Sequence, residues 1–504
     1  GGGGSGGSVM LVTHRWNDKS QGTVSACGGA GSGMAPHFAS DRAGGGGGGG
    51  RVSVDSIDSG FPIAVLVLAN GGRSGPPCGN STENPYNAAA GTVFYAAGRT
   101  LIVSNKDAAG KAVQPSTDCT KEGLLASCAT TVLSPFPSFI WNSFAMQGSA
   151  VGSFDRLRVE INLFQSIVLQ DSALVHYYPA SQSQMPWLYM QAQEIQLLDQ
   201  SVMLVSGALD MQAHDKFELD EYSSLSIVSH SSNDSPSRIS SDTVLVQAGS
   251  SLSSQGTLAL AGSDRLELGQ NGVSGVASIA ARNLVVSRYS SMLIKDGGTV
   301  QSSASTPAGH QVRDPGCNIA RKCPDYITTK GSVGKDPCDA EKLDGMFGLR
   351  ICGVMDVILD SGGSVRGQGI HLYRVKTLTV EHGARMSASG QGCGAGNGPG
   401  NGTSNVLGAG GGAGYGGHGG SSSQASQTAT GGVAYGSQEV YPCALGSGGG
   451  DGEQGPGGAG GGVIVLGSER DPLNLLVVRG SISADGSHGG GGGAGGGPEG
   501  NWGA

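Results

Sequence analysis

The chain has 504 residues, of which 93 are glycine, 14% are charged and only 5% are aromatic. Its formal net charge is −9 at pH 7, which argues against nucleic acid as a partner, because phosphate neutralisation needs clustered Lys and Arg. The longest apolar run, Ile63–Ala69, falls far short of the roughly 18 residues of a membrane-spanning helix. We therefore expect no nucleic-acid partner and no membrane span within this chain.

Residues 1–100 form a glycine-rich region with embedded apolar runs such as Val9–Val12 and Val52–Val54. Glycine tracts return near the C-terminus, and the full set is Gly1–Gly7, Gly44–Gly50, Gly408–Gly420, Gly448–Gly462 and Gly489–Gly497. Such tracts are interpreted either as flexible linkers or as ordered chain in a polyproline-II-like geometry. The direct junctions with strand-like runs favour order. Because glycine loses the most backbone entropy on ordering, neighbouring backbone must then hold the tracts in place.

Residues 101–310 are nearly free of tracts and carry a repeat. An apolar-x-apolar pair recurs at spacings of 22, 27, 22 and 18 residues, at Ile195/Leu197, Phe217/Leu219, Val244/Val246, Leu266/Leu268 and Leu284/Val286. Alternation of this kind indicates strands with one buried face. Repeats of about 20 residues are typical of a right-handed parallel β-helix. An antiparallel sandwich is the alternative, although turn signals between paired strands are scarce.

Residues 311–350 form an irregular insertion that bears cysteines, and residues 351–504 return to strand repeats and glycine tracts. Strand pairs are expected at Val357/Leu359, Leu378/Val380 and Leu475/Val477. The sequence thus predicts an all-β, right-handed parallel β-helix or β-solenoid with ordered, polyglycine-II-like layers.

Ten widely spaced cysteines and three N-glycosylation sequons, at Asn80, Asn233 and Asn401, together indicate an oxidising, secretory environment. The candidate disulfide cysteines are Cys119, Cys128, Cys317, Cys323, Cys338 and Cys352. The last four bracket one irregular segment, so we expect them to pair among themselves, and Cys119 to pair with Cys128.

Phrases along nearly the whole chain resemble a family of large glycine-rich, membrane-anchored cell-surface proteins of plants and green algae. They include GGGGSGGSVMLV at 1–12, VSACGG at 24–29, AAGTVFYAAGRTLIV at 89–103, LDQSVMLVSGALDM at 198–211, ICGVMDV at 351–357 and YGSQEVYPCALGS at 435–447. The resemblance implies that the chain is the ectodomain portion of such a protein. It carries over no catalytic residue and implies an anchor that this chain does not contain.

Candidate chemistry is sparse. Gly417-His418-Gly419 resembles a fragment of a polygalacturonase motif but lies in a glycine tract. The densest acidic group, Asp215, Glu218, Asp220 and Glu221 near Lys216, is interpreted as a solvated edge. Several aromatic residues are candidates for stacking on sugar rings: Trp141, Trp187, Tyr177, Tyr178 and Tyr189. We expect no catalytic residue, cofactor or metal site.

These observations favour an extracellular structural glycoprotein that forms part of a cell-surface, wall or filament assembly. Its expected partners are further copies of itself or other surface glycoproteins. A polysaccharide-binding ectodomain, with wall polysaccharide as the partner, is the alternative. A β-helix polysaccharide lyase or hydrolase is the third hypothesis.

Overall fold

A computed structural model describes, with short gaps, residues 142–302, 338–339 and 348–489, and before residue 134 mainly isolated strands. These residues form strands and no helix. No helix in the described part of the chain could therefore cross a membrane. The chain divides into two compact units, Gly1–Ile279 and Ala280–Ala504, and each is described by itself.

The first unit begins with short strands and continues with longer ones. Its strands are β1 (Ser8–Thr13), β2 (Gly22–Ser25), β3 (Arg51–Ser56), β4 (Val65–Leu68), β5 (Gly91–Tyr95), β6 (Thr100–Ser104), β7 (Thr131–Val132), β8 (Ser143–Gln147), β9 (Val151–Phe154), β10 (Arg158–Asn162), β11 (Ser166–Leu169), β12 (Leu174–Tyr177), β13 (Trp187–Leu197), β14 (Val202–Ser206), β15 (Ala208–Leu219), β16 (Ser224–Val228), β17 (Ser237–Val246), β18 (Ser251–Ala261) and β19 (Arg265–Leu268). The pairings are parallel apart from that of β5 with β6.

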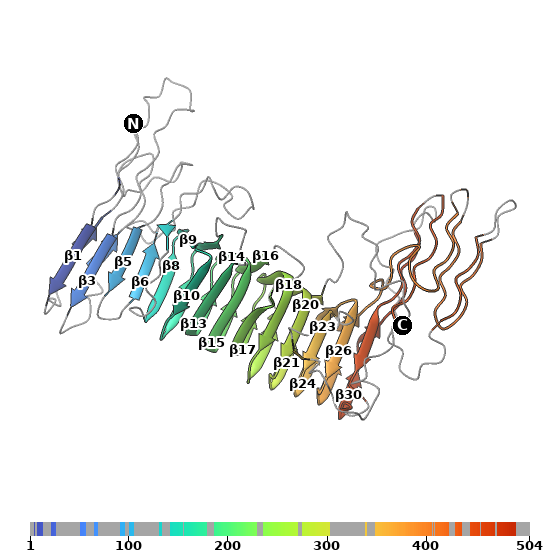
Figure 1. Cartoon of the computed structure of the whole chain (residues 1–504). Coiled ribbons are helices and arrows are strands. Elements are labelled where there is room, and N and C mark those ends of the chain that lie inside the picture. Colours follow the sequence, from blue (N-terminus) through green and yellow to red (C-terminus); the bar gives the residue numbers. More distant parts are fainter. Residues whose placement is uncertain are drawn as a thin grey trace, which may run out of the picture. The chain divides into compact units, whose positions relative to one another are not determined.

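Strands far apart in the sequence lie side by side in this unit (Figure 1). One ladder runs β8, β11, β13, β15, β17 and β19, and a second runs β9, β12, β14, β16 and β18. Strand β13 is long enough to pair with two strands: its first half pairs with β10 and its second half with β11. Register shifts in β13 and β15 mark the bend between the two halves.

The repeat seen in the sequence is the register of the first ladder. Ile195 lies opposite Phe217, Phe217 opposite Val244, and Val244 opposite Leu266. All four side chains are fully buried. Each spacing of 22 or 27 residues is therefore the length of chain that returns a buried side chain to the same place on the next strand. Burying such a side chain contributes about 1.5–3 kcal/mol.

The corner between β13 and β14 and the corner between β15 and β16 have the same turn. Asp199 and Gln200 both have positive φ, as do Glu221 and Tyr222 in the next turn. Two successive residues of this kind define the type I′ turn. The Gln200 amide donates to the Glu221 carbonyl at 2.8 Å, so the turns bond to one another as the strands do.

The second unit repeats three short strands. Its elements are β20 (Ala277–Ser287), β21 (Ser291–Ile294), β22 (Gly298–Ser302), β23 (Leu349–Cys352), β24 (Asp356–Leu359), β25 (Ser364–Arg366), β26 (Gly369–Tyr373), β27 (Thr377–Val380), β28 (Arg385–Ser387), β29 (Val463–Leu466), β30 (Leu475–Val478) and β31 (Ser481–Ser483). Each strand pairs in parallel with the one three places on, so β23, β24 and β25 pair with β26, β27 and β28 (Figure 1).

The last described repeat differs in exposure. Leu378 and Val380 are fully buried, and the residues opposite them in β30 are Leu476 and Val478. The sequence predicted Leu475 and Val477 as the inward-facing pair, but the register aligns Leu476 and Val478 with the buried residues of β27. Because side chains alternate along a strand, a shift of one residue places the predicted pair on the other face. Leu476 and Val478 are 46% and 47% exposed, because no further described strand pairs with β30 beyond β27.

Candidate functional site

Between β28 and β29 the chain builds a bundle of glycine-rich segments, which we call the glycine bundle (the described residues of 388–462 and 484–489). Its backbone groups bond across segments. The Cys393 amide donates to the Gly446 carbonyl, the Gly446 amide to Gly461, and the Gly460 amide to Cys393, each at 2.9 Å. Three segments therefore bond to one another in a closed triangle.

A second triangle lies further along the bundle. The Gly412 amide donates to the Gly420 carbonyl at 2.9 Å, the Gly419 amide to Gly432 at 2.9 Å, and the Gly432 amide to Gly412 at 2.8 Å. These segments form no β-ladder. Each is bonded to two neighbours through backbone groups, and the Ser421 hydroxyl adds a contact by accepting from the Gly431 amide at 3.1 Å.

The segments approach too closely for side chains. A Cβ atom at Gly402 would collide with the Gly411 carbonyl, and one at Gly461 with the Ala484 carbonyl. The neighbouring atoms are backbone and cannot turn aside as a flexible side chain can. Glycine is therefore required at these positions by packing.

The bundle surrounds a hollow of about 680 Å³. Its walls are glycine, alanine and serine residues together with Val463 and Ile464 of β29, and Tyr415 is the one aromatic residue among them. The Tyr415 ring meets Tyr435 edge to face, with centroids 4.9 Å apart. Burial raises the pKa of Tyr435, and the Ser447 hydroxyl donates to the Tyr435 oxygen at 2.8 Å. The tyrosine pair thus anchors one side of the bundle.

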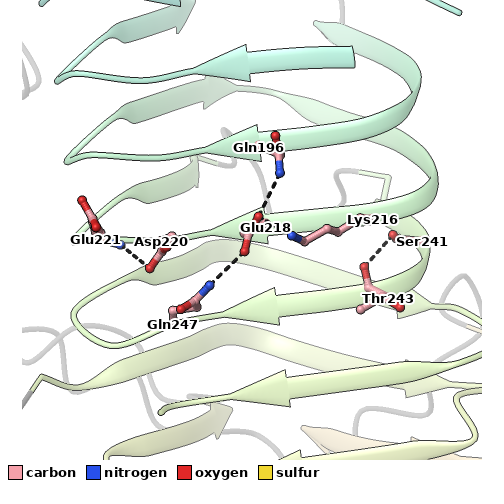
Figure 2. Close-up of polar contacts among 8 residues, drawn as sticks. All are labelled: Gln196, Lys216, Glu218, Asp220, Glu221, Ser241, Thr243 and Gln247. Carbon is pink, nitrogen blue, oxygen red and sulfur yellow. Dashed lines mark hydrogen bonds and ion pairs between the residues drawn. The ribbon is translucent and has the colours of Figure 1, made fainter. Parts of the chain in front are cut away.

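The acidic group was predicted to form a solvated edge. This prediction is wrong for Glu218, which is buried, whereas the other members lie at the surface. Glu218 is 7% exposed and accepts hydrogen bonds from the side-chain amides of Gln196 at 2.9 Å and Gln247 at 2.8 Å (Figure 2). The Lys216 Nζ lies 2.6 Å from its second oxygen. Glu218 is therefore a buried carboxylate whose partners come from β13, β15 and the residue after β17.

The rest of the acidic group lies at the surface. Asp215 and Glu221 are exposed, and Asp220 accepts a bond from the Glu221 amide at 2.8 Å (Figure 2). A hydrogen bond to Asp199, with repulsion from Asp199 and Asp220, raises the pKa of Glu221. Among the described residues, no group of three or more His, Cys, Asp or Glu is placed to hold a metal ion.

The candidate aromatic residues differ in their exposure to solvent. Tyr177 is fully buried, and its hydroxyl donates to the carbonyls of Leu157 at 2.7 Å and Trp187 at 3.1 Å. It is a core residue and cannot meet a ligand, because β12 is buried on both faces. Tyr178 is exposed and stacks on His176, whereas Trp187 and Tyr189 stack on each other and are partly exposed. Trp141 lies outside the described residues.

Two of the cysteines expected to pair with each other, Cys338 and Cys352, form a disulfide. Cys119, Cys128, Cys317 and Cys323 lie outside the described residues. Cys393, which had no predicted pairing, is also disulfide-bonded.

Among the sequons, Asn401 is exposed in the glycine bundle, and its amide donates to the Gly396 carbonyl at 3.1 Å. Asn80 and Asn233 are not among the described residues. His418 of the Gly-His-Gly phrase is exposed in the same bundle.

Comparison of the chain with protein-family models, with curated proteins and with solved structures found no match. The class of protein therefore comes from the structure. It is an all-β protein of largely parallel sheets, consistent with a β-solenoid, with a glycine-rich bundle in its second unit.

Proposed function

We propose that this chain is an extracellular structural glycoprotein that forms part of a cell-surface, wall or filament assembly. In this proposal the strand repeats wind as a right-handed parallel β-helix. The glycine bundle forms polyglycine-II-like layers on it. Copies of the chain, or other surface glycoproteins, associate through these elements.

The observation that carries the proposal is the bonding of the glycine bundle. In polyproline-II geometry a chain has three residues per turn and no internal hydrogen bonds, so its amides bond to water or, where chains pack together, to neighbouring chains. The two triangles of amide-to-carbonyl bonds, at Cys393/Gly446/Gly460–Gly461 and at Gly412/Gly419–Gly420/Gly432, follow that pattern. A bundle that excludes side chains is suited to rigid packing.

The exposed face of β30 supports association. Leu476 and Val478 hold positions that are core in the preceding repeat, yet each is nearly half exposed. An open strand edge next to exposed apolar residues is a surface on which another strand can pair. A second copy placed there would extend the parallel stack in the same direction.

The Cys338–Cys352 disulfide and the exposed Asn401 sequon support the extracellular assignment. Peptide mapping without reduction, on protein isolated from its natural source, tests it. The proposal expects disulfide-linked peptides and a glycan on Asn401. Free thiols throughout and a bare Asn401 would contradict it.

Electron microscopy of the purified chain, over a series of concentrations, tests the structural role. The proposal expects rods that lengthen end to end as concentration rises. Single particles of constant size at every concentration, in the absence of other surface glycoproteins and in their presence, would contradict it.

A further inference from the structure

The outward faces of β10, β13, β15 and β17 carry aligned rows of side chains. Glu160, Tyr189, Asp210 and Arg238 occupy successive strands of one row. Parallel neighbours of this kind lie about 4.8 Å apart. Trp187 precedes Tyr189 by two residues and therefore projects from the same face. We call these five residues the aromatic face.

The aromatic rings of this face are available to a ligand. The Trp187 and Tyr189 ring centroids are 5.6 Å apart with an interplanar angle of 27°, and both residues are partly exposed. Solvated aromatic rings on one sheet face are unfavourable in water and favourable against the C–H groups of a ligand, since the ring face carries partial negative charge.

Polar side chains surround and orient the rings. The Tyr189 hydroxyl donates to the Gln191 amide oxygen at 2.8 Å, and the Gln191 amide lies 2.8 Å from a ring nitrogen of His214. Partial burial raises the pKa of Asp210, with Arg238 and Gln212 acting in the opposite direction. The carboxylate of Asp210 and the guanidinium of Arg238 thus lie beside the rings of Trp187 and Tyr189 as a hydrogen-bond acceptor and a hydrogen-bond donor.

The charges of the row, and of Arg158 beside it, decide which ligand fits. Arg238 stands next to Asp210, and Arg158, opposite Trp187, lies on the same strand as Glu160. The two cations and two carboxylates balance one another, so these side chains present no net charge to a ligand in contact with them, and the chain's net charge of −9 disfavours a polyanion over distance. A neutral ligand with an apolar face and a hydroxyl rim matches this surface.

We propose that the aromatic face binds a neutral polysaccharide, with pyranose rings stacked on Trp187 and Tyr189 and with sugar hydroxyls bonded to Asp210 and Arg238. A pyranose ring presents axial C–H groups to an aromatic ring and equatorial hydroxyls to side chains at its edge. Carboxylates and guanidinium groups form the stronger, charge-assisted bonds to such hydroxyls. This binding function does not depend on the scaffold role proposed above.

Isothermal titration calorimetry of the purified full chain against cellohexaose, xylohexaose, mannohexaose and a hexameric oligogalacturonate tests the proposal. At least one neutral hexamer is expected to bind with a Kd below about 1 mM, and the uronate at least about tenfold more weakly. Failure of all three neutral hexamers, or preference for the uronate, would overturn the proposal.

Matched variants locate the site. Trp187→Ala and Tyr189→Ala are each expected to weaken binding by about tenfold or more, as expected for central aromatic anchors. Asp210→Asn keeps the shape of the side chain and is expected to weaken binding with unchanged thermal stability. The control is Tyr222→Ala, an exposed tyrosine on a corner turn, which should bind as the parent does. Equal affinity of the control and the two aromatic variants would contradict this location.

Discussion

Gly419 lies so close to Gly412 that a Cβ atom added to Gly419 would collide with the Gly412 carbonyl oxygen. A Cβ atom added to the next residue, Gly420, would have no neighbouring atom within 4 Å. Neither glycine has a positive φ, so space alone separates them. Two adjacent residues of one tract therefore differ in whether packing requires glycine.

Replacement of these two residues tests the packing of the bundle. Gly419→Ala is expected to destabilise the protein by about 1–3 kcal/mol, because backbone must move to admit the methyl group. Gly420→Ala is expected to be neutral or to stabilise by up to about 1 kcal/mol, since alanine restricts the unfolded chain. Thermal unfolding of the two variants measures the difference, and equal midpoints would show that the tract is not packed as described.

Glu218 provides a second test, within the first unit. Glu218→Ala leaves the Gln196 and Gln247 amides and the Lys216 ammonium without their shared acceptor, and is expected to cost about 2–4 kcal/mol. The control is Glu267→Ala, which removes a more exposed ion pair with Arg265 and should cost less than about 1 kcal/mol. Denaturant unfolding of both variants checks the prediction. A cost for Glu218→Ala no larger than that of the control would contradict the buried network.

The raised pKa of Glu221 predicts a pH dependence. A carboxyl whose folded pKa is raised stabilises the fold while it is protonated, and that contribution is lost as pH rises from the unfolded pKa through the folded one. The parent is therefore expected to lose stability relative to Glu221→Gln over this interval, and more so at low salt. Thermal midpoints across a pH series, at two salt concentrations, measure this. An increase in the stability of the parent relative to Glu221→Gln as pH rises would contradict the arrangement with Asp199.

The exposed face of β30 predicts a defect in assembly without a defect in folding. Leu476→Lys places a charge on a position that is already 46% exposed, so the stability of the monomer should change little. Association through this face should be lost. Sedimentation velocity against the parent checks the prediction, with Leu378→Lys as the buried counterpart that should fail to fold. Unchanged association of Leu476→Lys would rule out this face as the contact.

The strand repeat could be predicted because its signal is local. Pairs such as Phe217/Leu219 and Val244/Val246 alternate within a few residues, and their spacing gave the ladder directly. The bend in β13 could not be predicted, because a register shift near Ala192 leaves no mark on the alternation. The off-by-one reading at Leu475 arose because four apolar residues in a row have no alternation to read.

The candidate sites were less predictable for a different reason. Glycine residues carry no side-chain pattern, so no sequence feature says that Cys393 bonds to Gly446 or that Gly419 bonds to Gly432. Gln196 and Gln247, whose side-chain amides donate to Glu218, lie 22 and 29 residues from it in the sequence. Tyr177 and Tyr189 look alike in the sequence, and only the covering of β12 on both faces separates the core residue from the partly exposed one.

Hydrogen exchange of the native protein, followed by mass spectrometry of peptides spanning residues 392–462, measures the order of the glycine bundle most directly. We expect slow exchange at the amides of Gly412, Gly419, Gly432, Gly446 and Gly460, because each donates to a carbonyl of another segment. Exchange of these amides at the rate of an unstructured chain would contradict backbone packing of the bundle, and with it the proposed scaffold.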